Sequence, residues 1–476
     1  MSPLVGTGGL AEVTNALPRA LRVQGHDVRV VMPLYRAVAE EYRGRRVCDV
    51  LGHVNGEAVH GVLNEARVPG SDIPLYLVQH EGYYGRDYLY GDGAVEYPDN
   101  LARFTFFCRA VLDGLPKTGW RPDVVHCHDW HTALLPVYIK HECGNDPYWG
   151  GMPTVYTIHN LAYQGVHKAE ELSVTGLGAD VFHMECMEFW GGVNLMKGGI
   201  AFASQINVVS PQYAKEVLES RAFGMGLEGF LNRRRGDLSG IINGVDYSIW
   251  NPAKDEYIPA KYSVQDMAGK AVCKKAVRNM YGLPERDVPL IGMVTRVDPQ
   301  KGVDLLIKAI PELIQNDLQL VVLGTGDPDL ERGLAQAVRK GHDRARFDCR
   351  FHVPTSHKMM AGSDFFLMPS RFEPCGLGQM YAMAYGAIPI VRAVGGLIDT
   401  VTNTTKATLA RHEATGLVFA PMTADALTRA VKRAVDLYAD KAKLENVRQA
   451  AMAADWSWEV SSKAYVALYR KAMARP

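Results

Sequence analysis

Short apolar runs that alternate with helical patterns are the feature that most constrains the fold of this chain. Candidate strands rich in β-branched residues occupy residues 27–32, 123–127, 154–158, 206–209, 240–242, 289–295, 318–323, 365–368 and 388–391. Several are almost continuously apolar, which is typical of parallel strands covered on both faces. Helical patterns lie between them, as at residues 10–24, which end at Gly25. The alternation predicts an α/β fold with parallel sheets.

One interruption of this alternation predicts two domains. It lies near residues 243–246, where a polar, proline-containing stretch begins, and the strand–helix pattern starts again at Pro289. A chain of 476 residues is long enough for two or three domains. We therefore expect a first domain over residues 1–246, a second over 247–455 and a terminal helix over 456–476, with a cleft between the two domains.

The beginning of the chain departs from this pattern. A Gly-rich turn at residues 7–10 leads into the first helix, and no strand precedes it. In a doubly wound sheet the first strand normally feeds such a turn and lies near the centre of the sheet. Either the sequence is truncated at its N-terminus or another segment fills this place, and we expect the truncation.

The composition argues against several classes of partner and of site. The 52 Lys+Arg balance 52 Asp+Glu, so broad electrostatic binding to nucleic acid or to an anionic membrane is not expected. No apolar run is long enough for a membrane span, and no signal peptide is visible. The 8 cysteines form no CxxC pair, which favours reduced thiols and no metal site. We expect a cytoplasmic protein, or a plastid protein if the chain is eukaryotic and truncated.

Two glycine turns are candidate anion sites. Gly8 and Gly9 stand at a predicted helix start, where free backbone N–H groups favour an anion. Gly324 follows the strand at residues 318–323, at a carboxyl end where open α/β sheets bind ligands. For both, a tight turn without a ligand is the alternative interpretation.

Two cations follow the strand at residues 289–295. Arg296 and Lys301 flank a Pro/Gly loop before the next helical pattern. Fixed cations in such a place neutralise a diphosphate leaving group as it departs. A solvated loop is the alternative interpretation.

Residues 369–379 form the most informative segment. An apolar strand ends there, Glu373 stands in the turn, and Gly376-Leu377-Gly378 opens a helix whose N–H groups can hold phosphate. A carboxylate beside an anion site binds neutral hydroxyl groups, and this combination suits a nucleotide-sugar. The histidines at positions 128, 131 and 159 also follow apolar strands, although each alone is more often a structural hydrogen-bonding residue.

At these residues the chain resembles bacterial glycogen synthases and plant starch synthases, which are retaining glucosyltransferases of the GT-B type (glycosyltransferase family 5). The resemblance covers essentially the whole length and rests on residues 7–10, 121–131, 157–165, 224–228, 243–246, 300–302, 370–377 and 395–397. It implies two Rossmann-like doubly wound domains that face a deep cleft, with the last helix crossing back to the first domain. It also implies transfer of glucose from ADP-glucose, with UDP-glucose as second choice, to an α-1,4-glucan such as glycogen or starch, without a metal or organic cofactor.

The resemblance further implies roles for single residues. Arg296 and Lys301 would bind the diphosphate, and Glu373 would hold the 3- and 4-hydroxyls of glucose. His159 would contact the sugar near the reacting carbon, and Asp129 would line the acceptor side. With the turns described above, the expected substrate-binding residues are Gly8, Gly9, Asn160, Asn243, Gly324, Phe351, Cys375, Gly376, Leu377 and Gly378.

Several positions depart from the family pattern at the donor site. Gly6 stands where the family usually has lysine, Glu12 replaces an aspartate, Gly378 replaces a threonine, and residues 350–353 replace a Gly-aromatic-x-Glu segment. Two alternatives therefore stay open: a catalytically impaired glucan-binding homologue, and a related nucleotide-sugar transferase with another acceptor.

Overall fold

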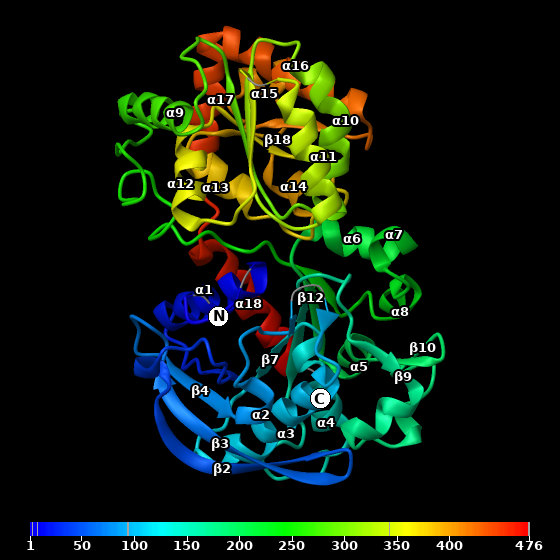
Figure 1. Ribbon diagram of the computed structural model, residues 1–476. Coiled ribbons are helices and arrows are strands. Elements are labelled where there is room, and N and C mark those ends of the chain that lie inside the picture. The colour runs from blue at the N-terminus through cyan, green and yellow to red at the C-terminus, as the bar shows by residue number, and fades with distance from the viewer. Residues whose placement is uncertain (2, 7, 93–94, 342, 475–476) are drawn as a thin grey trace. The chain divides into compact units, whose positions relative to one another are not determined.

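The computed structural model describes residues 1, 3–6, 8–92, 95–341 and 343–474 (Figure 1). Contacts within the chain divide it into two compact units. The first contains residues 1–209, 214–244 and 458–476, and the second contains residues 210–213 and 245–457. Each unit is an α/β structure with parallel strands, which confirms the predicted fold class.

The first unit contains two four-stranded sheets. One is entirely parallel and has the order β13-β12-β8-β7. Its strands are β7 (Val125–His128), β8 (Thr154–Ile158), β12 (Gln205–Val208) and β13 (Leu238–Gly240). The strands at residues 125–128, 154–158 and 205–208 lie where the sequence predicts them. The side chains of β8 and β12 are buried, and those of β7 are buried or half-buried.

The second sheet of the first unit has the order β1-β4-β3-β2 and is mostly antiparallel. Only β1 and β4 pair in parallel. The strands are β1 (Val30–Pro33), β2 (Arg45–Val54), β3 (Glu57–Arg67) and β4 (Pro74–Gln79). The sequence analysis did not predict β2, β3 or β4, so the expectation of parallel sheets was incomplete for this unit.

Helix α18 (Trp458–Met473) packs on β8 and β12 of the parallel sheet, and α1 (Gly8–Val23) packs against α18. Their buried side chains form one apolar cluster with Val155 of β8. The other helices of this unit are α2 (Glu81–Tyr84), α3 (Asn100–Lys117), α4 (Leu134–His141), α5 (Leu195–Phe202), α7 (Arg221–Gly224) and α8 (Glu228–Arg233), while α6 (Pro211–Glu219) begins in the second unit. Short strands β5 (Gly91–Asp92) and β6 (Val95–Glu96) pair with each other, and β9 (Val166–Lys168), β10 (Glu188–Phe189) and β11 (Gly192–Asn194) form a three-stranded sheet with the order β10-β11-β9.

Residues 3–6, which precede α1, form no strand in the part of the chain that the structure describes. Among the described strands, β1 and β7 are edge strands of separate sheets. Thr7 of the predicted turn lies outside the described residues. The expected truncation therefore stays a prediction.

The second unit is built on a six-stranded parallel sheet with the order β16-β15-β14-β17-β18-β19. Its strands are β14 (Leu290–Val294), β15 (Gln319–Leu323), β16 (Ala345–Asp348), β17 (Phe365–Met368), β18 (Ile388–Arg392) and β19 (Leu417–Phe419). Figure 1 shows helices on both faces of this sheet. They are α9 (Ala268–Met280), α10 (Val303–Leu313), α11 (Pro328–Arg339), α12 (Val353–Gly362), α13 (Gly378–Ala384), α14 (Gly395–Thr400), α15 (Lys406–Ala410), α16 (Ala424–Ala439) and α17 (Lys441–Ala453).

Alternate residues of these strands enter different apolar clusters. Leu320 and Val322 pack in the large cluster with α10 and α16, whereas Val321 and Leu323 pack in a second cluster with Met359 of α12. Both faces are therefore buried, which explains why the strands are continuously apolar in sequence. In the described ranges, no helix is both long and apolar enough to cross a membrane.

Candidate active site

A pocket of about 140 Å³ lies at the carboxyl ends of β14 and β17 in the second unit. Since these strands are parallel neighbours, the loops that follow them meet at one edge of the sheet. The lining residues are Met293, Val294, Thr295, Arg296, Lys301, Leu367, Met368, Ser370, Glu373, Gly376, Leu377 and Gly378. The structure thus brings together both predicted cations, the predicted carboxylate and the predicted glycine turn.

An ion pair forms the centre of this pocket. Lys301 Nζ lies 2.6 Å from Glu373 Oε2, and Glu373 is only 6% exposed. The hydroxyl of Ser370 donates to the same oxygen at 3.0 Å. Ser370 was not among the predicted site residues, although a polar residue three positions before the carboxylate in a turn is a recognisable signal.

The loop that carries the cations is fixed by its own polar contacts. Asp298 Oδ1 accepts a hydrogen bond from the backbone N–H of Lys301 at 2.9 Å. The guanidinium of Arg296 lies 3.2 Å from Asp298 Oδ2 and donates to Gln300 Oε1 at 3.2 Å. Gly302 has φ +71°, and a Cβ atom there would collide with the carbonyl oxygen of Pro369. Glycine is therefore required for the loop to pack against the end of β17.

The glycine turn leads directly into helix α13. Gly376 has φ +70°, Leu377 is the N-cap residue, and Gly378 begins the helix. Cys375 is buried next to the turn and is not among the residues that line the pocket. The predicted strand–turn–helix order at residues 369–379 is therefore observed.

Two predicted donor-side residues do not line this pocket. A Cβ atom at Gly324 would collide with the carbonyl oxygen of Thr295, so this glycine permits close packing of the loops after β14 and β15. Phe351 is 69% exposed. Their predicted roles in substrate binding stay predictions.

In the first unit, Asp129 and His159 lie at the carboxyl ends of β7 and β8. Asp129 Oδ1 accepts a hydrogen bond from the backbone N–H of His159 at 2.7 Å. Asp129 has φ +54° and ψ −176°, a strained conformation for any residue other than glycine. Burial raises the pKa of the Asp129 carboxyl to about 7, although backbone N–H groups of His159 and Asn160 oppose the rise. Strain and a buried carboxyl in one place are typical of a functional site.

Histidine side chains of β7 and of the residue after β8 contact one another. His128 Nδ1 lies 3.1 Å from His159 Nε2, and His126 Nε2 lies 2.7 Å from Thr157 Oγ1. Burial lowers the pKa of His128 to about 4 and holds the pKa of His159 well below its usual range, so both rings are neutral at neutral pH. The contact between His128 and His159 was not predicted, although β-strand alternation places positions 126 and 128 on one face. Across the described ranges, no group of three or more His, Cys, Asp or Glu side chains is arranged to hold a metal ion.

The remaining predicted residues of the first unit lie at the start of α1 and on loops. A Cβ atom at Gly9, on the first turn of α1 after Gly8, would lie 3.9 Å from Asn243 Nδ2. Asn160 Oδ1 accepts a hydrogen bond from the N–H of Ala162 at 3.0 Å. Asn243 Oδ1 and His159 Nδ1 are buried and have no hydrogen-bond partner among the described residues. Buried polar atoms without partners are costly, so these two atoms favour a polar ligand.

The Asp129 carboxyl predicts a pH-dependent stability. Because its pKa in the folded state lies above the usual value of 3.8, the folded protein holds the proton more tightly than the unfolded chain. Its contribution to stability is therefore complete below about pH 4 and is lost as the pH rises to about 7. We expect the difference in melting temperature Tm between Asp129→Asn and the unaltered protein to increase in favour of the variant from pH 5 to pH 8. A constant difference would mean that the backbone N–H groups keep the carboxylate ionised throughout.

Comparison with known proteins identifies the family. The family model described as "Starch synthase catalytic domain" matches residues 1–233, and the model "Glycosyl transferases group 1" matches residues 278–452. A protein named glycogen synthase from Geotalea daltonii is 44% identical over 100% of this chain and 98% of its own length. One named glycogen synthase 2 from Geobacter sulfurreducens is 46% identical over 99% of this chain and 97% of its own length.

Solved structures agree with these matches. The catalytic domain of starch synthase IV from Arabidopsis thaliana, bound to ADP and acarbose, superposes with a TM-score of 0.91 at 33% identity, covering 100% of this chain and 98% of that one. A sucrose-phosphate synthase from Thermosynechococcus elongatus gives a TM-score of 0.58 at 20% identity, covering 99% of this chain and 95% of that one, and shows the shared fold alone. The fold, the full-length identity and the family models together show that this chain is a glycosyltransferase of the GT-B fold and belongs to the glycogen and starch synthase family.

Proposed function

We propose that this chain transfers glucose from ADP-glucose to the 4-hydroxyl at the non-reducing end of an α-1,4-glucan, with retention of configuration. The observation that carries the proposal is the pocket of the second unit, which gathers Arg296, Lys301 and Glu373 beside the turn at residues 376–378. Cations next to a buried carboxylate suit a ligand that is anionic at one end and rich in hydroxyls at the other, which is the chemistry of a nucleotide-sugar.

Arg296 and Lys301 act on the diphosphate. As the bond between glucose and phosphate breaks, negative charge grows on the leaving oxygen, and fixed cations stabilise that charge more in the transition state than in the ground state. Asp298 holds the backbone of Lys301 in place, so the ammonium group is positioned before the substrate arrives.

Glu373 acts on the sugar. Its carboxylate accepts hydrogen bonds from Ser370 and Lys301 on one oxygen, Oε2. The other oxygen accepts from glucose hydroxyl groups, which fixes the ring relative to the diphosphate. Lys301 therefore orients the Glu373 carboxylate and also supplies positive charge for the leaving diphosphate.

The first unit carries neutral polar groups of its own. The ring of His159 is neutral because of its burial, so it donates or accepts hydrogen bonds at the sugar without adding charge. Asp129 orders the backbone at His159, and Asn160 and Asn243 offer amide groups to hydroxyls. Gly8 and Gly9 leave room for a ligand near the start of α1.

We also propose which donor is used and that no cofactor is required. ADP-glucose is the expected donor, and we expect transfer without a metal or an organic cofactor, as the family resemblance implies. The bacterial relatives named glycogen synthase support glycogen as the acceptor. We also propose the cytoplasm as the location.

The test measures incorporation of labelled glucose into glycogen from ADP-glucose and from UDP-glucose, each with and without EDTA. We expect faster transfer from ADP-glucose, no effect of EDTA, and release of the label by β-amylase, which digests α-1,4-linked chain ends. Glycogen binding without transfer from either donor would favour the impaired homologue. Transfer to a small sugar but not to glycogen would favour a transferase with a different acceptor.

A further inference from the structure

A second candidate site lies at the hairpin of β10 and β11 in the first unit. Phe189 pairs with Gly192, so Trp190 and Gly191 form a two-residue loop. Their φ angles are +53° and +80°. Two consecutive positive φ angles in such a loop are characteristic of a type I′ turn, which strongly prefers Asn-Gly.

The chain itself contains the preferred form of this turn. In the hairpin of β2 and β3, Val54 pairs with Glu57, and the loop between them is Asn55-Gly56 with φ angles of +53° and +77°. A bulky residue is disfavoured in the left-handed region, where asparagine is tolerated. Tryptophan at position 190 is therefore unfavourable for folding, and an unfavourable residue at an ordered position indicates a function.

The indole of Trp190 is presented to solvent. Its side chain is 77% exposed, although tryptophan is normally buried on average. Phe189 meets it edge-on at 6.3 Å between ring centroids, and the guanidinium of Arg221 lies 5.7 Å from its centroid. The N–H of Gly191 donates to Glu188 Oε1 at 2.8 Å and fixes the loop. These contacts orient the ring without covering it.

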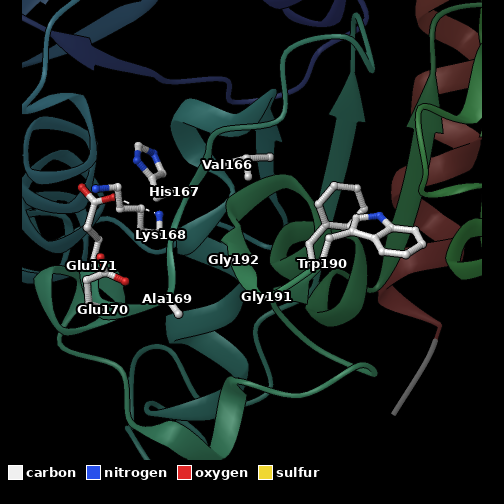
Figure 2. Close-up of a pocket in the computed structure, with 10 residues that line it drawn as sticks. Val166, His167, Lys168, Ala169, Glu170, Glu171, Trp190, Gly191 and Gly192 are labelled. Carbon is white, nitrogen blue, oxygen red and sulfur yellow. Dashed lines mark hydrogen bonds between the residues drawn. The ribbon is translucent and has the colours of Figure 1, made fainter.

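A pocket of about 620 Å³ lies beside this ring (Figure 2). Figure 2 shows Trp190 on one side and Lys168, Glu170 and Glu171 on the other. The pocket is lined by β9, by the segment that follows it and by the hairpin. Its charged lining residues comprise one cation and two carboxylates, a mixture that suits a neutral hydroxylated ligand and not a polyanion.

The pocket is lined by a segment that follows His159 closely in the sequence. Only residues 160–165 separate His159 from β9 (Val166–Lys168). Gln164 and Asn194 join this segment to the end of β11 through a buried side-chain hydrogen bond of 2.5 Å. A Cβ atom at Gly165 would lie 2.8 Å from the ring of Trp130, next to Asp129. The same short stretch of chain therefore supports both the predicted acceptor residues and the pocket.

We propose that Trp190 and this pocket bind a stretch of the α-1,4-glucan chain away from its reacting end. The proposal rests on the proposed function for the identity of the glucan. The flat indole packs against the apolar C–H face of a glucose ring, while Lys168, Glu170 and Glu171 hydrogen-bond the hydroxyls at its edge. Binding here holds a long acceptor while its end reacts.

The test replaces Trp190 by the residue that the chain uses in the hairpin of β2 and β3. Trp190→Asn relieves the strained position, so we expect Tm to rise by about 2 to 4 °C. In affinity electrophoresis through glycogen-containing gels without donor, the dissociation constant for glycogen is expected to increase about three- to tenfold. In transfer assays, KM for glycogen is expected to rise more than KM for maltotriose. Met184→Ala, at an exposed apolar residue outside the pocket, serves as the matched control and should bind glycogen normally.

A variant that gains stability and loses glycogen affinity supports the site, because a structural role for Trp190 would give the opposite change in stability. Unchanged glycogen affinity in Trp190→Asn overturns it. Unchanged affinity together with a lower molecular mass in solution would instead indicate a surface for a second copy of the chain, and also overturns it. If the unaltered protein binds glycogen through Trp190 but transfers no glucose, the site stands and the proposed catalytic function fails.

Discussion

Replacing Lys301 by alanine is expected to lower kcat by about a hundred- to a thousandfold, the usual cost of removing one group that stabilises developing charge. Lys301 Nζ contacts Glu373 Oε2 at 2.6 Å within the pocket of the second unit. The variant loses charge at the leaving group and also leaves the buried carboxylate without its partner. Initial rates at saturating ADP-glucose and glycogen measure the effect on kcat.

A double variant separates the catalytic effect from the structural one. Lys301→Ala alone should also lower Tm, since it leaves a buried charge unpaired, whereas Lys301→Met with Glu373→Gln removes both charges and should recover much of the lost Tm. Its activity should stay as low as that of the single variant. Lys308→Ala, at an exposed lysine on α10, is the matched control and should behave as the unaltered protein. Full activity in the double variant would refute the assigned roles.

Tyr465→Ala is expected to destabilise the first unit by about 3 to 5 kcal/mol, the usual cost of deleting a buried aromatic ring. Tyr465 of α18 is fully buried in the cluster that joins α1, α18 and β8. Its hydroxyl lies 3.3 Å from Asn207 Nδ2, and its ring centroid lies 5.7 Å from that of His126. Urea unfolding, followed together with hydrogen exchange of amides in β8 and β12, measures the loss.

Two further variants define what the ring contributes. Tyr465→Phe keeps the packing of the ring and removes the hydroxyl that contacts Asn207, so it should cost about 1 kcal/mol. Val460→Ala changes an exposed side chain on the same helix and should leave the stability nearly unchanged. Equal stability of Tyr465→Ala and Val460→Ala would show that α18 does not stabilise the first unit.

The parallel strands could be predicted because burial on both faces leaves a simple signature. The strands at residues 154–158 and 365–368 have the same bounds in sequence and structure, since nearly every side chain in them is buried. The hairpin of β2 and β3 was missed because many of its side chains are exposed or half-buried, so polar residues interrupt the apolar pattern. Its Asn55-Gly56 turn is nevertheless a sequence signal for a two-residue hairpin loop.

Residues of the candidate site could be predicted where the order of the strands alone decides which loops meet. Lys301 and Glu373 are far apart in sequence, but they follow strands that proved to be parallel neighbours, so their loops meet. The contacts of His128 with His159 and of Ser370 with Glu373 depend on side-chain orientation, which strand alternation specifies only in part. Trp190 was missed because its significance depends on a positive φ angle and on exposure, which become visible only in the folded chain.

The position of α18 in the chain determines when, during translation, the first unit can complete its apolar cluster. The ribosome makes this helix after residues 245–457 of the second unit, yet the helix completes the apolar cluster of the first unit. Residues 245–457 must be translated in between, which takes about 10 to 40 s at about 5 to 20 residues per second. During that interval the nascent first unit exposes the apolar surface that α18 later covers. Chaperone binding to this surface is therefore expected to begin before residue 245 is added and to end only after α18 has emerged from the ribosome.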